Sequence, residues 1–134
     1  MLSHRRTKYT RTGYLSPIDA TLEAIGGKYK VTLLYHLRCG VQRFSELRRF
    51  LPQATQRMLT LQLRELERDG LIIRTVVAPR PLRIEYKLSG DGRTLNPILD
   101  ALCEWGKRRI RRHVVEKPSS AAIWRELVIP PPAI

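Results

Sequence analysis

Apolar residues recur at helical spacing through the first half of this chain. The pattern predicts three short helices, over residues 17–25, 28–38 and 45–51. Ser16 and Pro17 suit the start of the first helix, because serine caps free backbone amides and proline fits the first helical position. A glycine or a proline follows each segment and disfavours its continuation.

A fourth helix is predicted from Thr55 to Gly70, and its apolar and basic residues fall on opposite sides. Thr55 suits the N-cap, and Gly70 suits the left-handed residue that stops a helix. One side is an apolar seam of Leu59, Leu63 and Leu66, and the other carries Arg57, Leu61, Arg64 and Arg68. This pattern is typical of a helix that packs on a core through one face and leaves the other free to bind.

Beyond Gly70 the period of the apolar residues changes towards two. The runs over 71–77 and 83–88 are rich in β-branched residues, and Arg80 lies between two prolines in the connection. We therefore expect a β-hairpin with a basic tip. The Gly90-Asp91-Gly92 sequence breaks the pattern, and a broad apolar stripe then predicts a long last helix over 95–112.

Composition limits the class of protein. The chain has 134 residues with 43% apolar content, which suffices for one compact domain, and its formal charge of +13 attracts polyanions. Nucleic acid is therefore the expected partner. No segment has the roughly 18 consecutive apolar residues of a membrane span, and the N-terminus lacks a secretory pattern, so we expect a cytoplasmic protein that binds no membrane.

Catalytic chemistry finds no support in the sequence. The three histidines and two cysteines have no metal-ligand spacing, and no phosphate loop or nucleophile elbow is present. We expect no catalytic residue, no metal and no cofactor. Cys39 and Cys103 are expected to pack as reduced thiols.

The order of the elements predicts an α+β, mostly α fold, a winged helix-turn-helix with a two-stranded β-wing. In this fold the second helix of the helix-turn-helix enters the major groove of DNA. Residues 16–112 are expected to form this domain. Residues 1–15 are expected to be a basic flexible arm, and residues 113–134 a C-terminal extension with a short helix and a proline-rich tail.

Several short motifs in a fixed order resemble the HxlR family of bacterial and archaeal regulators, which is MarR-like. They lie in residues 25–30, 43–49, 58–60, 63–72, 85–86 and 105–106. The resemblance implies dimers joined through N- and C-terminal dimerisation helices. The interface residues expected here are Ile18, Leu22, Leu99, Leu102 and Trp105.

One position departs from the family. Many members have a cysteine that senses oxidants or electrophiles just before the proline of the first helix, and here that residue is Ser16. Serine forms neither a thiolate nor a disulfide, so this kind of sensing does not carry over to this chain.

Base contacts are expected from the first turns of the 55–70 helix, at Gln56, Arg57, Thr60 and Leu61. Arg57 is the strongest candidate, because arginine binds a guanine edge through two hydrogen bonds; Leu61 is either a contact to a thymine methyl or simply exposed. Phosphate contacts require only donors and charge, and the candidates are Arg43, Ser45, Arg64, Arg80 and Arg83. Arg64 could instead pair with nearby carboxylates.

The sequence thus predicts a homodimeric transcriptional regulator that binds a pseudo-palindromic operator in double-stranded DNA, and it favours repression over activation. The alternative is a sequence-neutral protein that coats DNA, because a charge of +13 binds phosphates without reading bases. The sequence leaves open whether a small-molecule effector binds.

Overall fold

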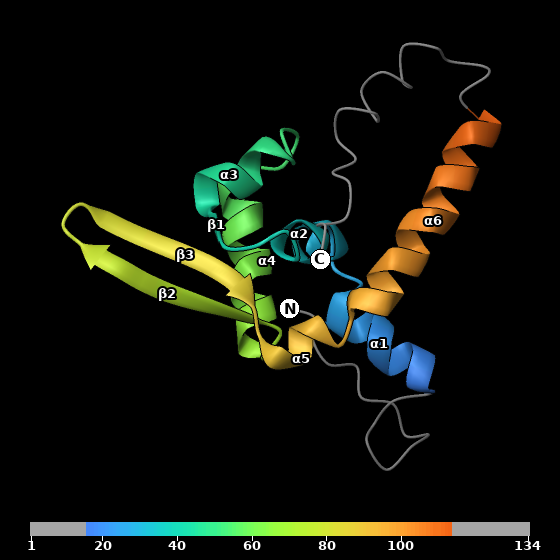
Figure 1. The fold of residues 1–134 in the computed structure, drawn as a ribbon, viewed down its shortest axis with the longest axis horizontal. Coiled ribbons are helices and arrows are strands. Elements are labelled where there is room, and N and C mark those ends of the chain that lie inside the picture. Colours follow the sequence, from blue (N-terminus) through green and yellow to red (C-terminus); the bar gives the residue numbers. More distant parts are fainter. Residues whose placement is uncertain (1–15, 114–134) are drawn as a thin grey trace.

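The computed structural model describes residues 16–113, in which helices form the body of the molecule and a β-hairpin projects from it (Figure 1). The expected arm over 1–15 and extension over 114–134 lie outside the described residues. The elements in order are α1 (Pro17–Ile25), α2 (Lys30–Leu37), β1 (Gln42–Arg43), α3 (Phe44–Arg49), α4 (Gln56–Arg68), β2 (Ile72–Pro79), β3 (Leu82–Leu88), α5 (Gly90–Arg93) and α6 (Asn96–His113).

The core forms where α2 meets α4, α6 and the sheet. Its fully buried leucines come from four helices and are Leu33, Leu34, Leu47, Leu59, Leu63, Leu66 and Leu99. Burial of one such side chain stabilises a fold by about 1.5–3 kcal/mol. Much of the apolar periodicity of the sequence thus corresponds to side chains buried in this core.

The sheet has three antiparallel strands in the order β1-β3-β2. Strands β2 and β3 form the wing, a hairpin with a register shift between Val76 and Ala78. The wing extends to one end of the longest axis of the molecule, whereas α1 and α6 lie towards the opposite end (Figure 1). The structure confirms the predicted winged helix-turn-helix and adds β1, which was not predicted.

Two further elements differ from the sequence prediction. The Gly90-Asp91-Gly92 segment lies in the short helix α5, which Ser89 caps by accepting a hydrogen bond from the amide of Gly92 at 2.9 Å. A Cβ atom on Gly92 would lie 2.0 Å from the carbonyl oxygen of Leu71, so glycine is needed there for close packing. Helix α2 begins two residues later than predicted, because Tyr29 adopts a left-handed φ of 74°.

Candidate nucleic-acid interface

Helix α4 is held so that one of its faces stays free. The hydroxyl of Thr55 accepts a hydrogen bond from the amide of Met58 at 3.1 Å, as an N-cap does. Leu59, Leu63 and Leu66 are buried, and Gly70 follows the helix with a φ of 77°. The cap, the seam and the stop all lie where the sequence predicts them.

The base-contact candidates lie in the first turns of α4. Gln56, Arg57 and Leu61 are exposed, and Leu61 is 52% accessible. Thr60 is half-buried, and its hydroxyl donates to the carbonyl oxygen of Gln56 at 2.8 Å. Its hydroxyl proton is therefore used within the helix. Among the described residues, nothing pairs with the guanidinium of Arg57, which leaves its five donors available.

Arg43 and Ser45 lie at the start of α3. Helix α3 begins at Phe44, one residue before the predicted start at residue 45, so Ser45 is its second residue and Arg43 its N-cap. The backbone amide of Arg43 donates to the carboxylate of Glu46 at 2.8 Å. Both Arg43 and Ser45 are exposed, beside the positive end of a helix dipole.

The other three phosphate candidates belong to α4 and the wing. Arg64 is exposed, and no carboxylate of the described part of the chain pairs with it. Arg80 is exposed at the hairpin tip, between β2 and β3. Arg83 forms an ion pair with Glu85 at 3.0 Å, so one of the wing cations is already partly neutralised.

Glu85 lies beside the phosphate-contact candidates Arg43 and Arg83, and the sequence analysis did not select it. It lies opposite Arg43 in the register of β1 and β3, and it also pairs with Arg83. One carboxylate therefore lies between two phosphate candidates that are 40 residues apart in the sequence. Only the pairing of β1 with β3 brings them together, and β1 is too short to show a period.

The candidates for a dimer interface divide into two groups. Ile18 and Leu22 on α1 are 71% and 59% exposed, and Leu102 and Trp105 on α6 are 45% and 59% exposed. Leu99, in contrast, is 1% exposed and belongs to the core of the protomer. We therefore remove Leu99 from the expected interface, since a side chain buried within one protomer has no surface to offer a second.

The apolar stripe of α6 thus faces both the core and the solvent. Leu99 is buried in the core and Leu95 packs against it, whereas Ile98, Leu102 and Trp105 recur at helical spacing on the exposed side. Ile98, which the sequence analysis did not select, is 40% exposed. These three side chains, with Ile18 and Leu22, are the large exposed apolar side chains of α1 and α6.

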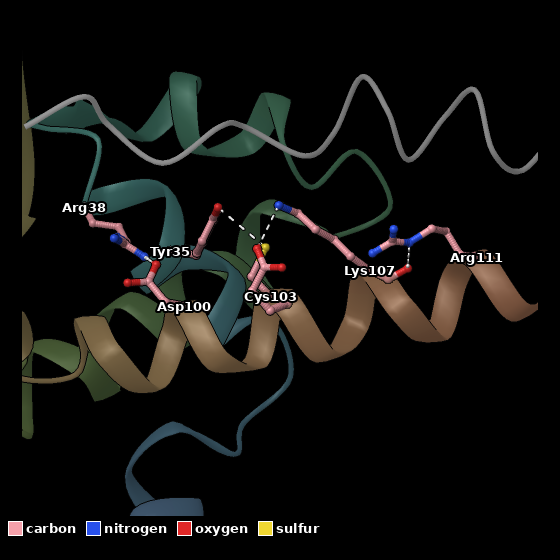
Figure 2. Close-up of polar contacts among 7 residues, drawn as sticks. Tyr35, Arg38, Asp100, Cys103, Lys107 and Arg111 are labelled. Carbon is pink, nitrogen blue, oxygen red and sulfur yellow. Dashed lines mark hydrogen bonds and ion pairs between the residues drawn. The ribbon is translucent and has the colours of Figure 1, made fainter.

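The junction of α2 and α6 is polar (Figure 2). The thiol of Cys103 donates to the hydroxyl of Tyr35 at 3.6 Å, and Arg38 forms an ion pair with Asp100. Burial and this thiol raise the pKa of Tyr35 to about 12, and burial also raises the pKa of the Cys39 thiol. A raised thiol pKa leaves little thiolate, so Cys39 is poorly suited to redox chemistry.

Ser16 has a clear structural role. Its hydroxyl accepts a hydrogen bond from the amide of Asp19 at 3.1 Å and so caps α1. Such a cap typically stabilises a helix by about 1 kcal/mol. Ser16 is therefore used to start the first helix.

Residues 16–113 contain neither a candidate metal site nor a candidate membrane-spanning helix. No three histidine, cysteine, aspartate or glutamate side chains in this range gather in a way that could hold a metal ion. In the same range, no helix combines the length and the apolar character that crossing a membrane requires.

Comparison with known proteins identifies the family. The family described as HxlR-like helix-turn-helix matches residues 24–114. The chain is 54% identical over 99 residues to YtcD of Bacillus subtilis, described as an uncharacterised HTH-type transcriptional regulator, which covers 74% of this chain and 79% of that protein.

Solved structures agree in fold. The redox regulator HypR in its reduced form superposes with a TM-score of 0.69 and 51% identity, covering 75% of this chain and 98% of that one. A protein of Enterococcus faecalis V583, described as a MarR-family regulator, superposes with a TM-score of 0.64 and 37% identity, covering 81% and 98%. The chain therefore belongs to the HxlR family of transcriptional regulators and carries its helix-turn-helix DNA-binding domain.

Proposed function

We propose that this regulator is a homodimer that reads a pseudo-palindromic operator in double-stranded DNA, with α4 of each protomer in a major groove. The observation that carries the proposal is the outward face of α4, where Gln56 and Arg57 are exposed in the first turn beside Leu61. Arginine and glutamine are the side chains that bind guanine and adenine edges through paired hydrogen bonds.

Phosphate contacts would hold α4 in the groove. Arg43 and Ser45 at the start of α3, Arg64 on α4, and Arg80 at the wing tip are exposed donors. These contacts supply affinity and orientation but no sequence preference. The full chain has a formal net charge of +13, so a dimer would have a formal net charge of +26, twice that of one chain.

The exposed apolar residues of α1 and α6 support the dimer. Leu22 and Trp105 are each 59% exposed, and large apolar side chains that gather on an exposed face mark interaction sites. Two copies of one patch make the symmetric contact on which two-fold operators depend. Repression follows most simply, because a dimer that covers an operator excludes other proteins from that DNA.

Selection from random duplexes at about 150 mM salt tests this function, since nonspecific phosphate binding is already weakened at that level. Inverted repeats should be enriched. Arg57→Ala should then lose preference at one base pair in each half-site, by about 1–3 kcal/mol, while its affinity for random DNA changes little.

Arg68→Ala is the matched control. Arg68 is the last residue of α4, is exposed and lies 3.6 Å from Asp69, so its loss removes the same charge from the same helix. It should leave base preference unchanged. Equal losses on target and random DNA in Arg57→Ala would refute base contact by Arg57.

Sequence-neutral coating of DNA is the second candidate, and the charge of +13 favours it. In that case the selection would enrich nothing, although binding at low salt would stay tight. A large ratio of target to random affinity at physiological salt would exclude it.

A further inference from the structure

A buried lysine joins the turn after α1 to α4. Lys30, the first residue of α2, is 4% exposed, and its Nζ lies 2.7 Å from Oε1 of Glu65 on α4. The side chain of Glu65 is 27% exposed. Lysine is almost never buried to this degree unless its charge is paired. The ion pair is therefore part of the way α4 docks on the domain.

The backbone of the same turn lies against α4. A Cβ atom on Gly27 would lie 2.5 Å from Oε1 of Gln62 and 2.8 Å from Cε of Lys30. Gln62 and Glu65 are three residues apart, so both lie on one side of α4. Tyr29 completes the turn in a left-handed conformation that is uncommon for a bulky residue. This polar contact is separate from the buried leucine seam.

The two contacts restrain different motions of α4. Apolar packing by Leu59, Leu63 and Leu66 keeps the helix on the core, but the hydrophobic effect has no direction. A short ion pair from Glu65 to a fixed lysine does have direction. It opposes rotation of α4 about its own axis, to which the leucine seam alone is less sensitive.

A small rotation of α4 would displace the side chains on its exposed face, which carries Arg57. At a side-chain radius of about 6 Å, a rotation of about 10° moves an atom by about 1 Å. Binding sites need their groups within about 0.5 Å of the productive position. The paired hydrogen bonds of Arg57 to a base edge would be lost before the charge contacts to phosphate, which tolerate such a shift.

We propose that Lys30 and Glu65 are positioning residues that set the rotation of α4, and with it the base preference of the regulator. The proposal rests on the proposed function, because it concerns how the same helix reads DNA. It distinguishes the residues that would contact bases, in the first turns of α4, from a partly buried ion pair that sets the direction of their side chains.

Three variants test the proposal: Lys30→Met, Glu65→Gln, and both together. Methionine keeps the unbranched stem that packs on Gly27, and glutamine keeps the shape of Glu65. The double variant leaves the net charge unchanged. The matched control is Lys107→Met with Glu104→Gln, which removes an exposed ion pair of 3.1 Å on α6 and also keeps the net charge.

The measurement is the ratio of affinities for the selected operator and for random duplex, at one salt concentration. A variant that only destabilised the fold would reduce the binding-competent fraction and lower both affinities equally, so the ratio would not move. The proposal expects each single variant to lose about tenfold in the ratio, which is the discrimination of one paired base contact. The double variant should lose no more than the worse single variant, because the pair acts as a unit.

A wild-type ratio in the double variant would overturn the positioning role and leave the proposed function intact. The same loss in the Lys107 and Glu104 control would overturn it as well, since any Lys–Glu pair would then have the effect. If the wild-type protein itself shows no preference between operator and random DNA, the proposed function fails, and this inference fails with it.

Discussion

Acidification should destabilise this protein through one buried imidazole. His36 on α2 is 3% exposed, and its ring stacks on Phe50 with centroids 3.9 Å apart and an angle of 10°. Within the described residues, its Nδ1 atom has no hydrogen-bond partner. Burial lowers the pKa of His36 from 6.5 to about 4, because a charged ring at this position would lose its hydration and gain no partner.

The sign and size of the effect follow from the two pKa values. Between pH 6.5 and pH 4 the unfolded chain binds a proton on His36 and the folded chain does not, so the free energy of unfolding falls as the pH falls. Each pH unit in this window costs about 1.4 kcal/mol. Acidification from pH 7.5 to pH 5 should therefore cost about 2 kcal/mol, a large fraction of the stability of a small domain.

Urea denaturation at pH 7.5 and pH 5, followed by circular dichroism at one protein concentration, measures this loss. His36→Phe is the informative variant, because phenylalanine can still stack on Phe50 but has no titrating group. It should lose about 2 kcal/mol less than the wild-type protein over the same interval. His113→Gln, at the exposed end of α6, is the control and should behave as wild type.

Carboxylates also titrate towards pH 5, and the comparison removes their contribution because both proteins share them. If His36→Phe and the wild-type protein lose the same free energy of unfolding between the two pH values, His36 is not the group responsible. The assignment of a neutral, buried ring would then be wrong.

Two further changes test the other surfaces. Trp105→Ala should shift the mass measured by light scattering from dimer to monomer, because the 59% exposed indole is the largest side chain of the expected interface, and an unchanged dimer would remove α6 from it. Arg80→Ala should weaken binding to all duplexes alike and reduce the slope of log affinity against log salt by about one, as loss of one phosphate contact requires. A greater loss on the operator than on random DNA would instead assign Arg80 to a base.

The sequence was sufficient to predict α4 because local rules agree there. The cap at Thr55, the seam through Leu63 and the stop at Gly70 each follow from residue type and helical spacing, and the structure places all three accordingly. The exposure of Arg57 follows from the same spacing, since a helix that buries one face must expose the other. Whether Arg57 meets a base depends on DNA and stays a prediction.

Features that depend on tertiary contacts were not predictable in the same way. Strand β1 has two residues and exists because β3 lies beside it. The burial of Lys30 depends on Glu65, which is 35 residues away, and a lysine at a helix start is ordinarily exposed. The stripe of α6 is broad enough to face two ways, so its period does not separate Leu99 in the core from Leu102 at the surface.

Helix α2 lies between α4, which is proposed to read DNA, and α6, which belongs to the expected dimer interface. It reaches α4 through Lys30, α6 through Tyr35 and Arg38, and the end of α3 through the stacking of His36 on Phe50. The groups in these contacts range from buried, for Lys30 and His36, to exposed, for Asp100. Such polar contacts add little stability, but they have a defined geometry.

In a dimer joined through α1 and α6, the separation of the two α4 helices is set by how α2 holds α6 on one side and α4 on the other. The contacts of α2 with α6, through Tyr35 and Arg38, should then govern the spacing between half-sites, whereas the Lys30–Glu65 pair and the first turns of α4 govern their sequence. The spacing and the sequence of an operator would therefore depend on different contacts, and substitutions should alter one while the other stays intact.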